Sequence, residues 1–343
     1  MPATSWIEIN GRKPASSIKG SGADMRVLLA GGAGFIGSHM ADALLARGDE
    51  VVAIDNLCTG RRQNVVHLAD NPSFTLIEHD ITIEWPAHPA LAERFDAVLD
   101  FASPASPNDF ATMPLEILAV GSTGTRRLLD RALADRAVFF LTSTSEVYGD
   151  PLVHPQPESY WGNVSSTGPR SCYDEAKRFS EALTMAYHRV HGLDIRIVRI
   201  FNTYGERMRP NDGRVVNTFV VQALTGQPLT LHGDGHQTRS FCHVIDEVRG
   251  LMALLDSDIT SPVNIGNPGE FTMRELAELV RELTQSESPI VSVPLPPERE
   301  GDPMQRCPDI TLARSALGWE PSVALREGLA LMIEHFRSHE DIS

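Results

Sequence analysis

Lysine is nearly absent from this sequence. Its 343 residues include 30 lysines and arginines, of which only three are lysines. Lys13 and Lys19 lie in the first twenty residues, so Lys177 is the only lysine in the body of the chain. Arginine stays protonated and is too bulky to replace a compact ammonium beside a tyrosine hydroxyl. The retained lysine therefore indicates a position that requires a small primary amine.

An excess of positive charge, long apolar runs and paired cysteines are also lacking. The formal net charge is −15, which argues against nucleic acid as a partner because that needs a basic surface. No apolar run approaches the roughly 18 residues of a membrane span, so no membrane partner is expected. The four cysteines, Cys58, Cys172, Cys242 and Cys307, have no CxxC spacing. We therefore expect free thiols and a cytoplasmic location.

Short apolar segments alternate with amphipathic ones over the first two hundred residues. The predicted strands are 25–30, 51–55, 74–80, 97–101, 138–143 and 195–200, with helices up to residue 47, near 114–135 and near 171–191. This alternation predicts an α/β fold with a Rossmann-like, doubly wound parallel sheet. Further helices are expected near 215–225, 272–285 and 323–338. They predict a smaller α/β C-terminal cap that binds the substrate.

The chain is long enough for two closely joined domains. We expect a dinucleotide-binding domain of residues 25–204 and 239–262, and a substrate-binding domain of residues 205–238 and 263–343. Residues 1–24 mix serine, glycine, lysine and proline without a continuous apolar core, which is not the pattern of a signal peptide. A disordered tail and the product of an upstream start codon both remain open for this N-terminal extension.

Three glycines follow the first predicted strand in the pattern GxxGxxG. Gly31, Gly34 and Gly37 lie between strand and helix. Glycine there lets the backbone approach a pyrophosphate, and the helix N-terminus supplies N–H groups. Asp55 ends the next strand, 18 residues after Gly37. A carboxylate at this place hydrogen-bonds the ribose hydroxyls of NAD and repels the 2′-phosphate of NADP.

Two neighbouring features qualify this cofactor prediction. Arg61 and Arg62 follow Asp55 closely and would suit the 2′-phosphate of NADP, although the carboxylate at the strand end favours NAD. Asp80 follows the third predicted strand and is a candidate to reach the adenine amino group. A tight turn without a ligand is the remaining alternative for the glycine motif.

Tyr173 precedes Lys177 by four residues in a predicted helix, so the two side chains share a face. A nearby ammonium lowers the pKa of a phenol, as a base acting on a sugar hydroxyl requires. Thr144, Ser145 and Glu146 follow the fifth predicted strand, which places them over the nicotinamide end of the cleft. This set predicts a dehydrogenase active site. The alternative is a surface Tyr/Lys pair on an amphipathic helix.

Seven motifs occur in the order found in one family of sugar-nucleotide enzymes. They are FASPASP (101–107), STSEVYGDP (143–151), GPRSCYDEAKR (168–178), RIFNTYG (199–205), NDGRVV (211–216), QTRSF (237–241) and RCPDI (306–310). Together they resemble the UDP-glucuronate decarboxylases, or UDP-xylose synthases, which are extended short-chain dehydrogenase/reductases. The resemblance covers about residues 25–337. It implies oxidation of UDP-glucuronate at C4 by NAD, loss of CO2, and reduction of the keto sugar to UDP-xylose.

The resemblance also implies roles for single residues. Tyr173 would take the C4-hydroxyl proton, and Thr144 would hydrogen-bond the same oxygen. Arg306 would orient the sugar carboxylate and help protonate C5, while Ser145 and Glu146 would hold the sugar and a water. No metal ion is implied. The other implied contacts are Asn202 and Arg239 with the substrate, and Phe35, Ile36, Asn56, Thr59, Gly60, Ile81, Phe101, Ala102, Ser103, Thr142, Lys177, Thr203 and Arg214 with NAD.

A homodimer is expected as well. In the resembling family the helices near 114–135 and 171–191 of two subunits form the interface. Their outer faces are expected to present Leu128, Leu129, Leu183 and Met185. A monomer with these residues in its own core is the alternative.

Ser145 distinguishes this chain from the related 4,6-dehydratases. Those enzymes carry aspartate at this position because a departing C6 hydroxyl needs an acid. The open alternatives are an enzyme that releases UDP-4-keto-pentose and NADH, a 4-epimerase or 4,6-dehydratase, and a non-catalytic NAD-sensing regulator. Arg306 as a loop surface residue and Glu146 as a helix-cap partner also remain open. The chain departs from the family at Phe110, Ala119–Gly121 and Cys307, where tyrosine, lysine–threonine–asparagine and lysine are usual.

Overall fold

Seven parallel strands form the central sheet. The structure is a computed structural model that describes residues 24–294 and 305–339, so all of the predicted extension except Asp24 lies outside the described residues. The strand order is β11–β6–β5–β4–β1–β2–β3, and every neighbouring pair is parallel. The strands are β1 (Arg26–Ala30), β2 (Glu50–Asp55), β3 (Phe74–Glu78), β4 (Ala97–Asp100), β5 (Val138–Thr144), β6 (Ile195–Ile200) and β11 (Pro262–Ile265). The predicted α/β fold is confirmed.

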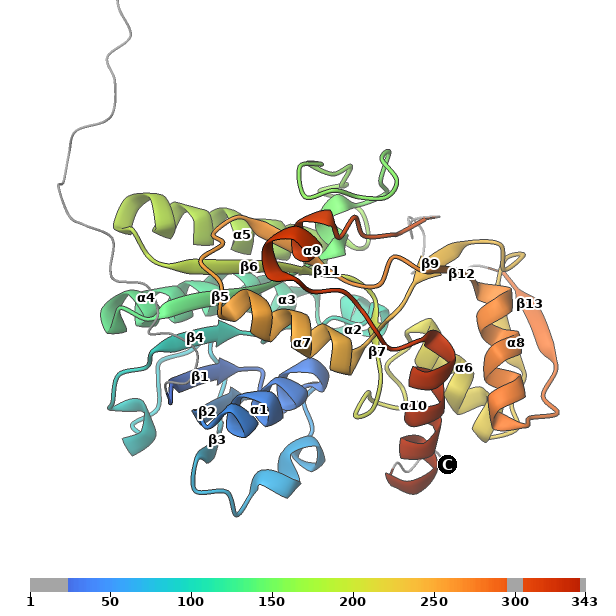
Figure 1. Ribbon diagram of the computed structural model, residues 1–343, viewed down its shortest axis with the longest axis horizontal. Coiled ribbons are helices and arrows are strands. Elements are labelled where there is room, and N and C mark those ends of the chain that lie inside the picture. The colour runs from blue at the N-terminus through green and yellow to red at the C-terminus, as the bar shows by residue number, and fades with distance from the viewer. Residues whose placement is uncertain (1–23, 295–304, 340–343) are drawn as a thin grey trace, which may run out of the picture.

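Helices cover both faces of this sheet because alternate strand residues point to opposite sides. Leu29 and Val51 pack with α1 (Phe35–Arg47) and α7 (Val244–Leu255), which Figure 1 shows in front of the sheet. Leu28 and Val52 face the other way and pack with α4 (Thr125–Asp135) and α5 (Ser171–His191). The sheet is therefore buried on both faces, which explains its nearly continuous apolar strands.

The predicted helix near 114–135 is divided into three parts. It consists of α3 (Pro114–Ala119), a π-helical turn at Val120–Gly124, and α4. Leu128 and Leu129 of α4 are fully buried against the sheet. The expectation that these two leucines lie on an outer face is therefore wrong, because that side of α4 closes the core of its own subunit.

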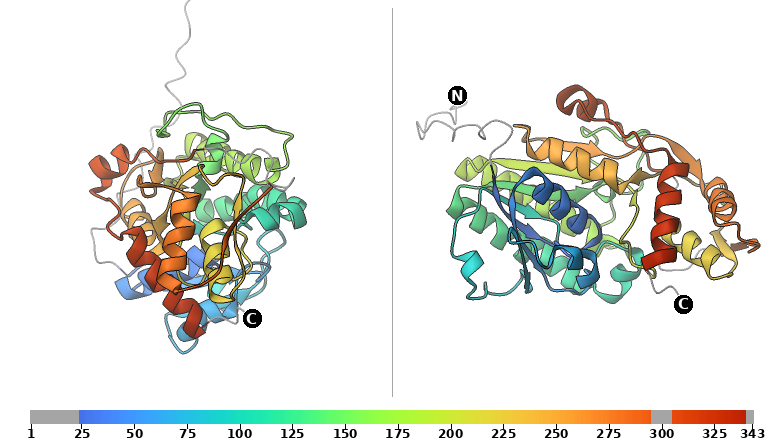
Figure 2. Two further views of the ribbon diagram at one scale, coloured as in Figure 1. Left: turned by 90° about the vertical axis from the view of Figure 1, so that its right-hand side faces the viewer. Right: turned by 60° about the horizontal axis from the view of Figure 1, so that its bottom comes forward.

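A smaller second domain stands at one end of the sheet, as Figure 1 and Figure 2 show. Its core lies between α6 (Val215–Leu224), α8 (Met273–Thr284) and α10 (Leu325–His339). Short strand pairs complete it: β8 (Leu229–His232) with β13 (Ile290–Val293), and β9 (Thr238–Ser240) with β12 (Glu270–Thr272). A third pair, β7 (Thr203–Tyr204) with β10 (Cys242–His243), lies where the chain crosses between the domains.

The expected domain boundaries need three corrections. The boundary between residues 238 and 239 falls inside β9 of the second domain. The boundary at residue 262 falls inside β11, which pairs with β6 at the edge of the central sheet. The helix α9 (Thr311–Leu317) also returns to the first domain, because Ala313 belongs to the same core as α7 and β11. The first domain therefore includes the seventh strand and the helix that covers it.

From β1 the chain adds β2 and β3 on one side of the sheet, and then β4, β5, β6 and β11 on the other side. At the carboxyl ends of β1 and β4, the connections therefore lead away in opposite directions. In open α/β sheets, ligands bind in the crevice formed at such a reversal. The short helix α2 (Pro107–Thr112) follows β4 there. No helix in the described part of the chain is long and apolar enough to cross a membrane.

Candidate active site

A cavity of about 690 Å³ opens at this edge, between the sheet and the second domain. All residues predicted for the site line it, from both domains. Those predicted for the cofactor are Gly31, Gly34, Phe35, Ile36, Gly37, Asp55, Asn56, Thr59, Gly60, Asp80, Ile81, Phe101, Ala102, Ser103, Thr142, Tyr173, Lys177, Thr203 and Arg214. Those predicted for chemistry or substrate are Thr144, Ser145, Glu146, Asn202, Arg239 and Arg306, together with Tyr173 and Lys177.

The glycine turn is shaped for close approach of a ligand. Gly31 has a φ of +79°, a conformation that glycine adopts without strain. A Cβ atom on Gly31 would lie 2.6 Å from the carbonyl carbon and oxygen of Phe101. A Cβ atom on Gly37 would collide with the carbonyl oxygen of Gly31. The turn therefore needs these glycines, and it leads into the N-terminus of α1 at Gly34, as a pyrophosphate site requires.

The carboxylate of Asp55 lies at the end of β2 beside this turn. It accepts hydrogen bonds from the backbone N–H groups of Ala33 at 3.0 Å and Leu57 at 2.8 Å. Burial raises the pKa of Asp55, and these N–H groups act in the opposite direction. The group lines the cavity, where it suits the hydroxyls of a ribose.

Arg61 and Arg62, which would suit the 2′-phosphate of NADP, contact other groups of the protein. Arg61 donates to the side chain of Asn64 at 3.2 Å and to the carbonyl of Arg207 at 3.1 Å. Arg62 pairs with Glu78 on β3. Neither arginine is among the residues that line the cavity. The residues at the ribose end therefore fit NAD, because Asp55 lines the cavity there and Arg61 and Arg62 do not.

Tyr173 and Lys177 lie in the first turns of α5, and both are buried. The Tyr173 ring stacks on Phe110, with centroids 4.9 Å apart, and its phenol is hydrogen-bonded by Thr144. The ammonium of Lys177 lies 6.0 Å from the centre of the Tyr173 ring and donates to the carbonyl of Thr142 at 2.9 Å. The alternative of a surface pair is therefore excluded.

The pKa of Tyr173 differs from the sequence-based expectation. Burial raises it to about 12 in the chain by itself, although the hydrogen bond from Thr144 acts to lower it. Arg214 also acts to lower it, while the ammonium of Lys177 faces the Thr142 carbonyl and interacts with buried Asp100. Burial also lowers the pKa of Lys177. Burial therefore opposes ionisation of the phenol in the chain by itself.

Glu146 and Arg306 form a buried ion pair next to Tyr173. Arg306 Nη1 lies 2.6 Å from Glu146 Oε1, and Arg170 Nη2 lies 2.6 Å from Glu146 Oε2. Burial acts to raise the pKa of Glu146, but the two guanidinium groups hold it well below its usual range. Glu146 is therefore a carboxylate in this site and has no proton to donate.

Arg306 is only 1% exposed, so the alternative of a loop surface arginine is wrong. It donates to the Gly149 carbonyl at 2.7 Å and to Ser145 Oγ at 3.3 Å. Its Nε has no hydrogen-bond partner within residues 24–294 and 305–339. A buried donor without a partner is costly, and in a residue that lines the cavity it is available to a ligand.

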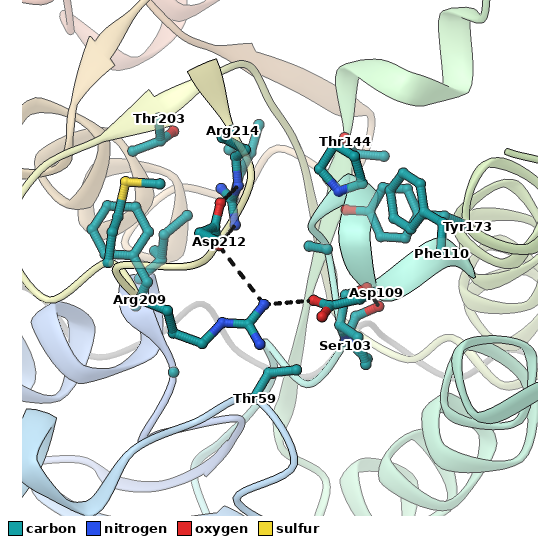
Figure 3. Close-up of a pocket in the computed structure, with 18 of the residues that line it drawn as sticks. Thr59, Ser103, Asp109, Phe110, Thr144, Tyr173, Thr203, Arg209, Asp212 and Arg214 are labelled. Carbon is teal, nitrogen blue, oxygen red and sulfur yellow. Dashed lines mark hydrogen bonds and ion pairs between the residues drawn. The ribbon is translucent and has the colours of Figure 1, made fainter. Parts of the chain in front are cut away.

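Sequence reasoning missed several charged groups around the cavity. Arg209, before α6, reaches Asp109 of α2 at 2.7 Å and Asp212 at 3.8 Å, as Figure 3 shows. This contact links the second domain to the first beside Tyr173. Arg170 was also missed as the second partner of Glu146. The signals were present, because Arg170 precedes Tyr173 in one motif and Arg209 lies in the turn-rich segment 207–214.

The substrate candidates Asn202 and Arg239 lie on the opposite wall. Asn202 donates to the Ser240 carbonyl at 3.4 Å, and Arg239 of β9 donates to the Thr238 carbonyl at 2.8 Å. Both therefore hold backbone groups of the second domain while lining the cavity. This position suits the diphosphate of a nucleotide sugar, since an arginine binds phosphate oxygens well.

Comparisons with known proteins agree with this geometry. Residues 28–332 match the family model of GDP-mannose 4,6 dehydratase. UDP-glucuronic acid decarboxylase 5 of Arabidopsis thaliana is 52% identical over 94% of this chain and 93% of its own length. UDP-glucuronic acid decarboxylase 1 of Danio rerio is 48% identical over 91% of this chain and 72% of its own.

Solved structures show the same fold. The UDP-glucose 4-epimerase of Thermotoga maritima, solved with UDP-glucose, has a TM-score of 0.82 and 30% identity over 91% of this chain and 99% of its own. The UDP-glucuronic acid 4-epimerase of Bacillus cereus, solved with UDP-glucuronic acid and NAD, has a TM-score of 0.79 and 28% identity over 91% and 99%. The chain therefore belongs to the GDP-mannose 4,6 dehydratase family and, by its identity to the plant and fish enzymes, to the UDP-glucuronic acid decarboxylases.

Proposed function

We propose that this protein converts UDP-glucuronate to UDP-xylose and CO2 with NAD as its cofactor. The observation that carries the proposal is the trio of buried Ser145, buried Arg306 and partly buried Glu146 beside the Tyr173–Lys177 pair. The relatives with about half of their residues identical are UDP-glucuronic acid decarboxylases. A related structure holds both UDP-glucuronic acid and NAD.

NAD, when bound, accepts a hydride from C4 of the sugar and later returns it. Gly31 to Gly37, Asp55 and the end of β4 would hold it, since they line the nucleotide end of the cavity. Tyr173 would take the proton of the C4 hydroxyl as the hydride leaves, with Thr144 hydrogen-bonded to the same oxygen. Lys177 would keep the local potential positive, because its ammonium lines the cavity 6.0 Å from the centre of the Tyr173 ring.

The resulting 4-keto sugar carries its carboxylate beta to the ketone, so CO2 can leave as the electrons pass into an enolate. Arg306 would hold the carboxylate through its free Nε donor. The enolate would then take a proton at C5, delivered by Arg306 directly or by a water that Ser145 and Glu146 hold. Tyr173 would give its proton back to the C4 oxygen as the 4-keto group is reduced, which would complete UDP-xylose.

The competing reactions fit the site less well. Elimination of water from C6 requires an acid, but Ser145 is a poor acid and the two arginines keep Glu146 ionised. A regulator without catalysis would not need a buried Tyr173 and Lys177 beside that carboxylate. Early release of UDP-4-keto-pentose with NADH uses the same residues, and only the product distinguishes it.

Substrate choice tests this function. We expect the purified protein to release CO2 from UDP-glucuronate and to leave UDP-glucose unchanged, because only the former has a carboxylate for Arg306. Proton NMR of the products, with and without added NAD, distinguishes UDP-xylose from the 4-keto pentose. Equal conversion of UDP-glucose to a 4-keto-6-deoxy sugar would overturn the proposal.

A homodimer is proposed through α3 and α5. Although Leu128 and Leu129 are buried, Leu115 on α3 is 75% exposed and Phe179 on α5 is 50% exposed. We expect light scattering at micromolar concentration to give twice the subunit mass, and Phe179→Glu to weaken the dimer. The exposed Leu331 on α10, replaced by glutamate, is the matched control. A single subunit mass for the unaltered chain would contradict the dimer.

We also propose a cytoplasmic location. The four cysteines are free thiols, and the described structure buries three of them, Cys172, Cys242 and Cys307. Free thiols are typical of a reducing compartment. Fluorescence microscopy of a tagged full-length chain, or cell fractionation, tests this assignment.

A further inference from the structure

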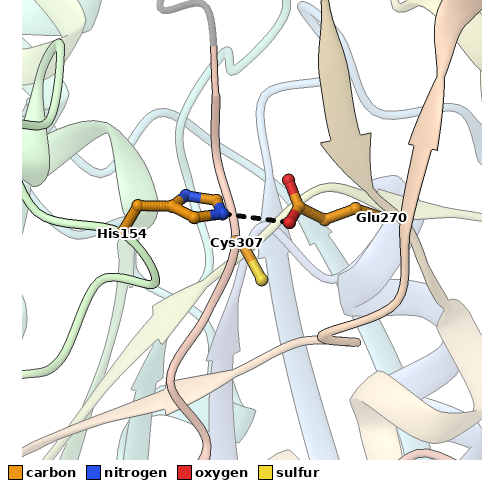
Figure 4. Close-up of side chains that lie close together, drawn as sticks. All are labelled: His154, Glu270 and Cys307. Atoms are coloured by element: carbon orange, nitrogen blue, oxygen red, sulfur yellow. Dashed lines mark hydrogen bonds and ion pairs between the residues drawn. The ribbon is translucent and has the colours of Figure 1, made fainter.

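Three potential metal ligands meet outside the cavity. His154 belongs to the loop between β5 and α5, Glu270 begins β12, and Cys307 follows Arg306 directly. One ligand atom from each lies within 4.8 Å of the other two. Figure 4 shows the imidazole and the carboxylate facing each other with the thiol beside them. Their closest pair, His154 Nε2 and Glu270 Oε2, is 2.9 Å apart.

Backbone hydrogen bonds hold two of these ligands together independently of any ion. Gln156, two residues after His154, is fully buried. Its N–H donates to the Cys307 carbonyl at 2.9 Å, and its side-chain oxygen accepts from the Cys307 N–H at 2.9 Å. His154 and Cys307 are therefore kept in register, which lowers the entropy cost of ligating one ion.

The third ligand is also oriented by its neighbours. Glu270 pairs with Ser240 across the antiparallel strands β12 and β9. One of its carboxylate oxygens accepts from Thr238 Oγ1 at 2.8 Å, which leaves the other facing His154. Such outer contacts orient metal ligands in proteins.

The ligand types favour one class of ion. A thiolate, an imidazole and a carboxylate suit Zn²⁺ and similar divalent transition metals, whereas Ca²⁺ and Mg²⁺ prefer oxygen ligands alone. Zn²⁺ at about 2.0–2.3 Å from each atom needs ligand atoms roughly 3.3–3.8 Å apart. The His154–Glu270 contact of 2.9 Å would have to open by a few tenths of an ångström, and the Cys307 thiol, which lies within 4.8 Å of both other ligand atoms, would have to move to that spacing. The side chains of His154 and Glu270 are 34% and 30% exposed, so water can reach a fourth position.

We propose that His154, Glu270 and Cys307 bind one Zn²⁺-class ion, with water as the fourth ligand. The ion would join the loop after β5, the β9–β12 pair and the segment that carries Arg306. That segment already contacts β9, because Ser240 Oγ donates to the Arg306 carbonyl at 3.3 Å. A bound ion would therefore restrain the backbone of Arg306 from outside the cavity.

Cobalt(II) absorption tests the site without substrate or cofactor. After treatment with a chelator, the full chain is titrated with Co²⁺, whose bond to a thiolate gives a near-ultraviolet charge-transfer band. We expect the band to saturate at one equivalent and to disappear on addition of Zn²⁺. Cys307→Ser should abolish the band, while Cys58→Ser, which alters the exposed cysteine, should leave it unchanged.

A second pair of variants tests the imidazole. His154→Ala should weaken Zn²⁺ binding at least about 10-fold in competition with a chromogenic chelator. His67→Ala is the matched control, because His67 pairs with Asp42 at 2.7 Å in the same way but is not in the cluster. Circular dichroism confirms that each variant is folded. Absence of the Co²⁺ band, or its persistence in Cys307→Ser, would overturn the site, and neither result bears on decarboxylation.

Discussion

Lys177→Arg is expected to lower turnover by about 10²–10⁴-fold, the contribution of a positioned general base. The ammonium of Lys177 is buried, donates to the Thr142 carbonyl at 2.9 Å and interacts with Asp100. A planar guanidinium is larger and cannot take this position. Tyr173→Phe should cause a loss of the same order, since it removes the proton acceptor at C4.

These two losses are measured as the rate of UDP-xylose formation by the purified variants. Arg189→Lys, a change at an exposed position of the same helix, is the control and should keep full activity. NAD binding separates the effects, because Tyr173→Phe should retain it. A fully active Lys177→Arg enzyme would show that the single lysine is not needed as a compact cation.

Arg306→Ala is expected to change the balance of the reaction rather than lower every step equally. The glycine turn and Asp55 lie at the other end of the cavity, so NAD binding should persist. CO2 loss and substrate affinity should both fall, because a sugar carboxylate in a dry pocket would lose its charged partner. Oxidation at C4 should persist more than CO2 release, which leaves bound NADH in excess over CO2.

NADH absorbance, CO2 release and substrate affinity should be measured on the same Arg306→Ala preparation. Arg326→Ala is the matched control. Arg326 also pairs with a glutamate, Glu282, at 2.8 Å, but on the surface, where such a pair contributes little. Its removal should leave all three quantities unchanged. Unaltered CO2 release in Arg306→Ala would assign the carboxylate to another group, of which Arg170 is the nearest candidate.

Local sequence patterns were sufficient to predict the first six strands of the central sheet, the glycine turn and the helix that carries Tyr173. The helix predicted at 171–191 is α5 with the same bounds, because an amphipathic run and its terminal glycine are local signals. The strand β11 was missed, since its four residues Pro262–Ile265 are too short a segment to stand out in the sequence. Only pairing with β6 makes that short segment a strand.

In the active site, too, some features were predictable from local sequence patterns and others depend on tertiary contacts. Every residue predicted from the glycine spacing and the ordered motifs lines the cavity, although Arg170 and Arg209, which also line it, were missed. The glycine spacing and the motifs could not predict that Lys177 faces the Thr142 carbonyl and Asp100, because side-chain direction depends on neighbours far apart in the sequence. They also could not predict that Leu128 and Leu129 close the core.

The sequence by itself determined the fold class, the cofactor site and the family, because these depend on residue types at short, ordered spacings. Only the tertiary structure decided the charge states around the substrate. Glu146 is ionised because Arg170 and Arg306, 24 residues and 160 residues away in the chain, meet it in a buried space. The tertiary structure likewise brings His154, Glu270 and Cys307 together. Electrostatic interactions act through space, so their partners appear only when the chain is folded.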